Sequence, residues 1–213
     1  MFHLPSIYPI TDTRISGLTH IEQVSRLIDG GATLIQLREK KASSREFYAE
    51  ALECVAYAHP RRVRIVINDR ADIALAVSAD GVHLGQDDMP PAAARELLGP
   101  NAIIGYSTHS VEQGVAAIDF PVDYVAIGPV FPTSTKENPD PVVGLKGVAS
   151  VRGSIGAKPL VAIGGIDEFR ISEVLAAGAD AVAMIGTILA DPTAISATMR
   201  RLQEKLLLNS EQK

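Results

Sequence analysis

A short pattern recurs four times along this chain and constrains its fold more than any other feature. In each copy, small or acidic residues lead into a run of hydrophobic residues. The copies are Gly31-Ala32-Thr33-Leu34-Ile35, Ala79-Asp80-Gly81-Val82, Val122-Asp123-Tyr124-Val125 and Gly178-Ala179-Asp180-Ala181-Val182. The spacing between successive copies leaves room for a helix, a strand and a second helix. Four such quarters predict eight strands and eight helices.

Strands and helices are expected to alternate strictly along the 213 residues. This alternation predicts a single (β/α)₈ TIM barrel of the α/β class, with an open doubly wound sheet as the alternative. We expect one domain over 1–213, with the barrel over about 7–207 and a tail over 208–213. The expected strands lie near 7–11, 33–38, 64–68, 81–84, 102–107, 123–128, 159–163 and 181–185. The expected helices lie near 19–29, 43–58, 71–77, 90–98, 110–118, 145–152, 168–176 and 192–207.

The composition narrows the classes of partner. The net charge is −5 and no Lys/Arg-rich run occurs, which argues against a nucleic-acid or membrane-surface partner and leaves small molecules. No apolar segment is long enough to span a bilayer, and the first nine residues lack the features of a signal peptide. The single cysteine, Cys54, is expected to be a buried hydrophobic residue of a helix, which is compatible with a reducing cytoplasm.

In a barrel of this kind, catalytic side chains lie where strands end and helices begin. After the second expected strand, alternation places Gln36, Arg38 and Lys40 on one face, while Ile35 and Leu37 face the helices. An amide and two cations that converge at the barrel mouth fit an anionic ligand such as a diphosphate. The alternative is a solvated strand end in which Arg38 pairs with Glu39.

Acidic residues follow the third and fourth expected strands, at Asp69 and at Asp88 (or Asp87). Neighbouring parallel strands end at the same edge of the sheet, so these carboxylates can face one another and would repel. A divalent cation between them removes this conflict, and oxygen ligands favour Mg²⁺. The alternative is that each aspartate caps the helix that follows it, which is the commoner role for a single such residue.

Later strand ends carry further polar residues. Ser107 can orient a heterocycle and His109 can act as a base, whereas Thr108 or Ser110 can cap the next helix. The long connection that follows the sixth strand includes Thr133, Thr135 and Lys136, which can donate to phosphate oxygens. Its length predicts a closing lid.

Glycines follow the last two expected strands, at Gly164-Gly165 and at Gly186 after Ile185. Glycine lets backbone N–H groups approach a phosphate closely, and barrels often bind phosphate at this position. Two glycine turns after consecutive strands therefore predict a phosphate site.

Taken together, six motifs resemble the thiamine phosphate synthase family over most of the chain, from Tyr8 to about Leu206. They are Gln-Leu-Arg-Glu-Lys (36–40), Ile-Asn-Asp-Arg (67–70), Gly-Val-His-Leu-Gly-Gln-Asp-Asp (81–88), Ser-Thr-His (107–109), Gly-Pro-Val-Phe-Pro-Thr-Ser-Thr-Lys (128–136) and Ala-Ile-Gly-Gly-Ile (162–166). The resemblance implies a (β/α)₈ transferase of thiamine biosynthesis. Such an enzyme joins 4-amino-5-hydroxymethyl-2-methylpyrimidine diphosphate to thiazole phosphate, releases pyrophosphate and uses Mg²⁺.

The resemblance also implies roles for individual residues. Asp69 and Asp88 match the magnesium ligands of the family. Its diphosphate contacts match Arg38, Lys40, Asn68 and Lys136, of which Arg38, Lys40 and Lys136 are the expected catalytic residues. Gln36 and Ser107 match the pyrimidine contacts. Positions around the thiazole phosphate match Thr133, Thr135, Gly165, Ile185 and Gly186, the last standing where many relatives have Ser.

Two other functions fit parts of the pattern. A related thiazole tautomerase would use a histidine base at the position of His109 but would lack the diphosphate cations and the acidic pair. A non-catalytic phosphate-binding barrel would need neither Lys136 nor both aspartates. By analogy with the family, the chain is also expected to form a homodimer.

Overall fold

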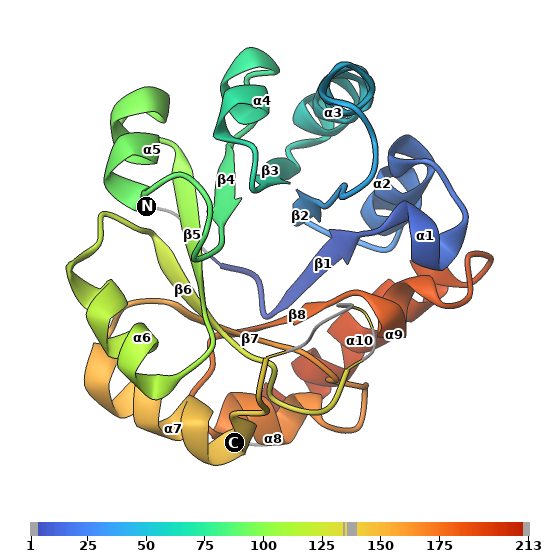
Figure 1. Cartoon of the computed structure of the whole chain (residues 1–213). Helices are drawn as coiled ribbons and strands as arrows, with labels where there is room; N and C mark the ends of the chain where they lie inside the picture. Colours follow the sequence, from blue (N-terminus) through green and yellow to red (C-terminus); the bar gives the residue numbers. More distant parts are fainter. Residues whose placement is uncertain (1–3, 134, 136–139, 211–213) are drawn as a thin grey trace.

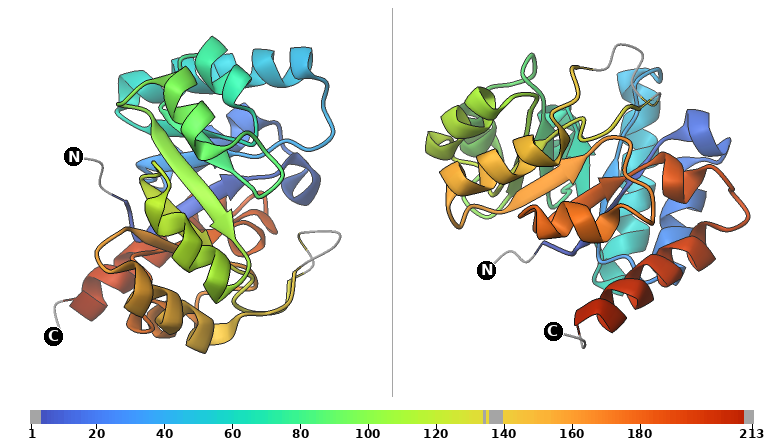
Figure 2. Two further views of the ribbon diagram at one scale, coloured as in Figure 1. Left: turned by 60° about the vertical axis from the view of Figure 1, so that its left-hand side comes forward. Right: turned by 90° about the horizontal axis from the view of Figure 1, so that it is seen from below.

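The computed structural model describes residues 4–133, 135 and 140–210, without the side chains of 207–210. Eight parallel strands form a closed barrel in the order β1-β2-β3-β4-β5-β6-β7-β8, with β1 also paired to β8. The expected (β/α)₈ barrel is thereby confirmed over the open sheet. Figure 1 shows the helices arranged around the ring of strands, and Figure 2 shows the barrel from two other sides.

The strands lie within about two residues of their expected positions. They are β1 (Ile7–Thr11), β2 (Leu34–Leu37), β3 (Arg64–Asn68), β4 (Gly81–Leu84), β5 (Ile103–Thr108), β6 (Tyr124–Ile127), β7 (Leu160–Ile163) and β8 (Ala181–Met184). The longer helices also follow the expected pattern. They are α2 (His20–Asp29), α3 (Ser44–Ala58), α4 (Ala71–Ala76), α5 (Pro91–Leu98), α6 (Val111–Ala116), α7 (Gly144–Ile155), α8 (Ile171–Ala176) and α10 (Ile195–Ser210).

Two short helices were not expected from the sequence. Helix α1 (Thr13–Ser16) follows β1, and α9 (Gly186–Leu189) follows β8. Each has only four residues, so neither carries the hydrophobic periodicity that predicts a helix. Two 3₁₀ turns, His59–Arg61 and Ala117–Asp119, extend the ends of α3 and α6.

Local sequence signals fix where two of the main helices begin. Thr19 caps α2 and Ser43 caps α3, and in each case a glutamate three residues later bonds back to the backbone of the cap. Such a reciprocal arrangement satisfies two N–H groups that otherwise lack partners at a helix start. The apolar stripe of α3, which includes Cys54, then packs on the barrel. Cys54 is fully buried, as expected, and burial raises its pKa to about 12.

Strand alternation divides the hydrophobic residues into two cores. Outward-facing residues such as Ile35, Leu37 and Ile65 pack against the helices in the larger core. A smaller core fills the barrel interior, where Tyr8 and Tyr124 are surrounded by aliphatic residues. Glycine at 105 makes room for them, since a Cβ there would lie 2.1 Å from the Tyr124 ring.

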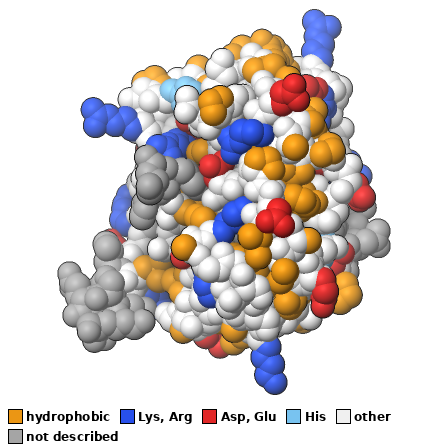
Figure 3. Space-filling view, turned by 90° about the vertical axis from the view of Figure 1, so that its left-hand side faces the viewer, with side chains coloured by type: hydrophobic (Ala, Val, Ile, Leu, Met, Phe, Trp, Pro, Cys, Tyr) orange, Lys and Arg blue, Asp and Glu red, His pale blue; other side chains and the backbone are white. Residues whose placement is uncertain are grey.

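The surface is mixed in character. On the face drawn in Figure 3, Lys and Arg side chains are scattered among acidic and hydrophobic ones. Among the described residues, no helix is both long and apolar enough to cross a membrane.

Candidate active site

A cavity of about 840 Å³ lies at the carboxyl ends of the strands. Every described residue that the sequence analysis selected for the site lines this cavity. These residues are Gln36, Arg38, Lys40, Asn68, Asp69, Asp88, Ser107, Thr133, Thr135, Gly165, Ile185 and Gly186. Lys136, the remaining selected residue, lies outside the described residues. One cavity therefore gathers side chains and glycines from seven of the strand ends.

An acidic pair stands on one wall of the cavity. Asp69 follows β3 and pairs with the ammonium group of Lys40, and its carboxylate lies beside that of Asp88. Burial raises the pKa of Asp88, and the neighbouring carboxylate of Asp69 raises it further. The N–H of Gly85 offsets part of this effect by donating to Asp88 Oδ2 at 2.7 Å. The two carboxylates thus face one another as the topology predicted.

The alternative, that these aspartates are helix caps, is wrong for both. Helix α4 has Arg70 at its N-cap position and α5 has Pro90, and neither start has a side-chain cap. Asp69 also adopts a left-handed backbone conformation, with φ of 63°, which turns the chain at the end of β3. Asp and Asn enter this region more readily than most residues. By contrast, Ser110 does cap α6, as the sequence suggested.

Cationic and amide donors lie next to the acidic pair. Arg38 is held by the buried carboxylate of Asp12, which caps α1 and also contacts Arg14. The alternative pairing of Arg38 with its neighbour Glu39 is therefore wrong. Asn68 Nδ2 is buried and has no hydrogen-bond partner among the described residues. A buried donor without a partner is costly, so this amide calls for an acceptor such as a diphosphate oxygen.

The floor of the cavity carries a continuous chain of hydrogen bonds. Gln36 Nε2 donates to the Tyr8 hydroxyl at 3.2 Å, and the Tyr8 and Tyr124 hydroxyls are 3.1 Å apart. The Tyr124 hydroxyl lies 2.9 Å from His83 Nδ1, and His83 Nε2 lies 2.8 Å from Ser107 Oγ. The chain joins Gln36 on β2 to Ser107 on β5 through the barrel interior.

The hydrogen bonds between Gln36 and Ser107 have a preferred donor-to-acceptor direction. Burial raises the pKa of Tyr8 to about 12 and lowers that of His83 to about 4, so the phenol keeps its proton and the imidazole is neutral. Gln36 Nε2 donates to the Tyr8 hydroxyl, which leaves the Tyr8 proton to be donated to the Tyr124 hydroxyl. Tyr124 then donates to Nδ1 of His83, whose Nε2–H donates to Ser107. Gln36 is left with a free oxygen and Ser107 with a free O–H toward the cavity.

Glu39 shapes the loop that carries Lys40. Its Oε1 accepts from the backbone N–H groups of Lys40, Lys41 and Ala42 at 2.7, 2.6 and 3.1 Å. Although burial raises the pKa of Glu39, these N–H groups and the nearby His20 lower it more, to about 2. The charged carboxylate therefore fixes the backbone between β2 and α3.

The variant Glu39→Gln tests this role through pH. The pKa of Glu39 falls from 4.5 to about 2 on folding, so its contribution to stability is present above about pH 4.5 and is lost as the pH falls toward 2. We expect the difference in free energy of unfolding between wild type and variant to shrink over this interval. Denaturant titrations from pH 2 to 6 measure it, and a difference independent of pH would contradict the assignment.

The opposite wall is formed by the connection after β6 and by the glycine turns. Val130 is buried and the N–H of Val143 donates to the oxygen of Pro129 at 2.9 Å, which anchors both ends of the connection. Gly165 has a φ of 64°, and a Cβ there would lie 2.4 Å from the oxygen of Pro132. Gly165 is thus required by close packing. Gly186 has open space around it, so the backbone does not require glycine there.

His109 also lines the cavity, and its Nδ1 lies 3.0 Å from the oxygen of Gly128 and 3.5 Å from Asp140 Oδ2. The sequence analysis missed Asp12, Tyr8, Tyr124 and the role of His83. Asp12 stands at the end of the first strand, so the search for polar residues at strand ends would have found it. Tyr8 lies near the start of β1 and Tyr124 at the start of β6, away from the carboxyl ends of the strands, and nothing in the sequence separates them from ordinary core residues.

The fold and the cavity together define an enzyme of the (β/α)₈-barrel class that acts on small molecules. Residues 7–188 match the family model described as thiamine monophosphate synthase. The chain therefore belongs to the thiamine monophosphate synthase family and is a transferase.

Individual relatives agree with this family. The thiamine-phosphate synthase of Koribacter versatilis is 46% identical over 196 residues, covering 89% of this chain and 91% of the relative. That of Chloroflexus aurantiacus is 42% identical over 208 residues, covering 94% and 95%. Among solved structures, thiamine phosphate pyrophosphorylase from Pyrococcus furiosus matches with a TM-score of 0.82 at 37% identity, covering 95% of this chain and 96% of that one.

Proposed function

We propose that this chain joins 4-amino-5-hydroxymethyl-2-methylpyrimidine diphosphate to thiazole phosphate, giving thiamine monophosphate and pyrophosphate. The observation that carries the proposal is the convergence of Arg38, Lys40 and Asn68 beside the Asp69–Asp88 pair. The amide N–H₂ of Asn68 has no partner among the residues that the structure describes. This wall presents positive charge and a hydrogen-bond donor to an anion. It also presents two carboxylates that need a cation between them.

The chemistry that these residues favour is ionisation of the bond between the pyrimidine methylene carbon and the diphosphate oxygen. The departing pyrophosphate gains negative charge, and Arg38 and Lys40 stabilise it in a partly enclosed cavity, where charges interact more strongly than in water. Asp69 and Asp88 would hold Mg²⁺, which supplies further positive charge to the leaving group. The thiazole nitrogen then attacks the pyrimidine cation.

No protein nucleophile is needed for this reaction. The only thiol, Cys54, is buried among the residues between α3 and the barrel, and its raised pKa of about 12 keeps it protonated. Protonated thiols are poor nucleophiles. The role of the chain is therefore to bind, orient and stabilise charge.

The hydrogen-bond chain on the floor would orient the pyrimidine. A 4-aminopyrimidine offers an N–H donor beside a ring-nitrogen acceptor, which matches the oxygen of Gln36 and the hydroxyl of Ser107. Thr133, Thr135, Gly165, Ile185 and Gly186 line the other wall of the cavity, where the thiazole phosphate would bind. In this proposal the two rings would lie side by side above the floor.

Removing one hydroxyl from this series of hydrogen bonds tests whether it orients the pyrimidine. We expect Tyr124→Phe to raise KM for the pyrimidine diphosphate by about tenfold, or about 1.4 kcal/mol, because His83 and Ser107 lose their fixed proton directions. The preference for the 4-amino over the 4-oxo pyrimidine should fall as well. Steady-state kinetics with both compounds measure these changes.

The matched control is Tyr57→Phe, because the Tyr57 hydroxyl bonds Ser25 on the outer helices, away from the cavity. This variant should keep the kinetics of the wild type. Equal KM values for wild type and Tyr124→Phe would show that these hydrogen bonds do not orient the substrate.

The reaction itself is tested by incubating the full chain with both substrates and Mg²⁺. Formation of thiamine monophosphate and pyrophosphate in equal amounts is expected. Isomerisation of a thiazole phosphate without coupling would instead favour the tautomerase alternative that relies on His109. Binding of both phosphates without turnover would favour the non-catalytic alternative.

A further inference from the structure

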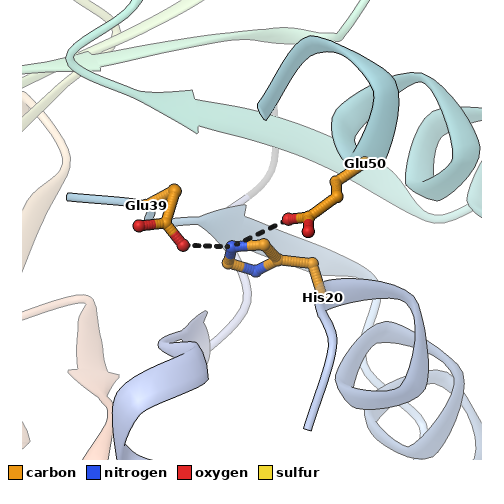
Figure 4. Close-up of side chains that lie close together, drawn as sticks. All are labelled: His20, Glu39 and Glu50. Atoms are coloured by element: carbon orange, nitrogen blue, oxygen red, sulfur yellow. Dashed lines mark ion pairs between the residues drawn. The ribbon is translucent and has the colours of Figure 1, made fainter. Parts of the chain in front are cut away.

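A second group of potential metal ligands lies behind the cavity wall. His20 at the start of α2, Glu39 after β2 and Glu50 in the middle of α3 point toward one another, as Figure 4 shows. His20 Nε2 lies 3.4 Å from Glu39 Oε2 and 3.8 Å from Glu50 Oε2. None of these three residues lines the cavity that holds the acidic pair. The group is therefore distinct from the proposed Mg²⁺ site.

Within the described part of the chain, two of the three facing atoms have no hydrogen-bond partner. His20 is fully buried, and both its Nε2 and Glu50 Oε2 are buried without a partner among the described residues. Glu39 Oε2 accepts from the Thr13 hydroxyl at 3.2 Å. Buried polar atoms are nearly always paired, so an imidazole nitrogen aimed between two carboxylates indicates a cation at this point.

The hydrogen bond between His20 Nδ1 and Thr11 indicates how Nε2 faces the carboxylates. The Thr11 hydroxyl lies 3.3 Å from the oxygen of Gln36, to which it can donate, and 2.8 Å from Nδ1 of His20, and we infer from this that Nδ1 carries the proton. Nε2 then carries a lone pair toward Glu39 and Glu50. A histidine that binds a metal through one nitrogen commonly donates from the other in this way.

The spacing fits a single ion. Zinc binds imidazole nitrogen at about 2.0–2.1 Å and carboxylate oxygen at about 2.0–2.2 Å, so two ligands of one ion are at most about 4.3 Å apart. The distances from His20 Nε2 to both carboxylates are below this limit. All three ligand atoms lie within 4.8 Å of one another, so only a small shift of the partly exposed Glu50 would be needed.

We propose that His20, Glu39 and Glu50 bind a divalent transition-metal ion of the Zn²⁺ type. An imidazole ligand favours such an ion over Mg²⁺, which prefers oxygen ligands. The ion joins α2, the end of β2 and α3. Because Glu39 also holds the N–H groups of residues 40–42, the ion stabilises the loop that carries Lys40 and takes no direct part in the reaction.

A proton shared between Glu50 and His20 is the competing explanation, and Glu50→Gln separates the two. The amide of glutamine imitates a protonated carboxyl group but is a poor metal ligand. If a metal binds, Glu50→Gln abolishes metal-dependent stabilisation. If a proton fills the gap, wild type gains nothing from metal and Glu50→Gln is as stable as wild type.

The experiment titrates Zn²⁺ into the chelator-treated full chain by calorimetry, with excess Mg²⁺ present to occupy the acidic pair. We expect one equivalent to bind wild type and to raise its thermal midpoint. The variant Glu50→Gln should bind Zn²⁺ at least tenfold more weakly, and Zn²⁺ should no longer raise its thermal midpoint. Glu53→Gln, at an exposed position of the same helix, and Asp69→Asn should both retain the binding of the wild type.

A spectroscopic measurement reports on the metal ligands directly. Co²⁺ in place of Zn²⁺ should give a visible absorption band in wild type and in Glu53→Gln that His20→Asn and Glu50→Gln lack. Wild type that binds no Zn²⁺, or a Glu50→Gln variant that binds one equivalent with unchanged affinity, would overturn the proposal. Neither result depends on thiamine phosphate synthesis.

Discussion

Replacing Asp69 with asparagine is expected to lower kcat/KM by about a hundredfold, or about 2.7 kcal/mol of transition-state stabilisation. The change removes one carboxylate of the acidic pair and the partner of the Lys40 ammonium. Asparagine accepts the left-handed backbone at this position, so the fold should survive. The decisive measurement is the rate as a function of Mg²⁺ concentration, which should shift to higher concentrations in the variant.

The matched control is Asp72→Asn, which makes the same change three residues further along the chain. Asp72 is exposed on α4 and pairs with Arg70, outside the cavity. Its loss should leave both the rate and the Mg²⁺ dependence unchanged. If Asp69→Asn keeps the Mg²⁺ dependence of wild type, Asp69 is not a metal ligand.

Replacing Arg38 with alanine is the second change with a large expected effect. Arg38 lines the cavity and is held in place by the buried carboxylate of Asp12. A guanidinium fixed in this way can stabilise a departing pyrophosphate without reorganising. We expect kcat to fall by about a hundredfold, again about 2.7 kcal/mol, with a smaller change in KM for thiazole phosphate. Single-turnover measurements with saturating substrates separate this chemical step from product release.

Arg14→Ala provides the control, because Arg14 contacts the same carboxylate of Asp12 but does not line the cavity. Both variants disturb Asp12, so a loss of stability should appear in both thermal unfolding curves. Only Arg38→Ala should lose more activity than its loss of stability explains. Equal losses of activity in the two variants would mean that Arg38 only supports the structure around Asp12.

Much of the candidate site could be predicted because it lies at strand ends. Once the repeat predicts eight parallel strands, every residue that follows a strand is placed at one rim of the barrel. Gln36 and Arg38 also follow from the period of two along β2. The helix-cap alternatives failed for two different reasons. Asp69 pairs with Lys40, which is a tertiary contact, whereas Asp88 accepts from the N–H of Gly85 in its own loop.

Other parts of the site could not be predicted from single residues. Tyr8 and Tyr124 are 116 positions apart, and their hydroxyls meet only because the barrel closes with both side chains inside. His20, Glu39 and Glu50 come from three elements whose relative positions are set by packing between α2 and α3.

The sequence by itself determined the order and type of the eight strands and the eight main helices, the closed barrel and the rim on which the chemistry lies. These follow from periodicity and from topology, which are properties of the chain read along its length. Only the tertiary structure decided which charged groups are partners: Asp12 with Arg38, Lys40 with Asp69, and His20 with two glutamates. Pairing depends on distances of a few ångströms between distant segments, and such distances exist only once the barrel has closed.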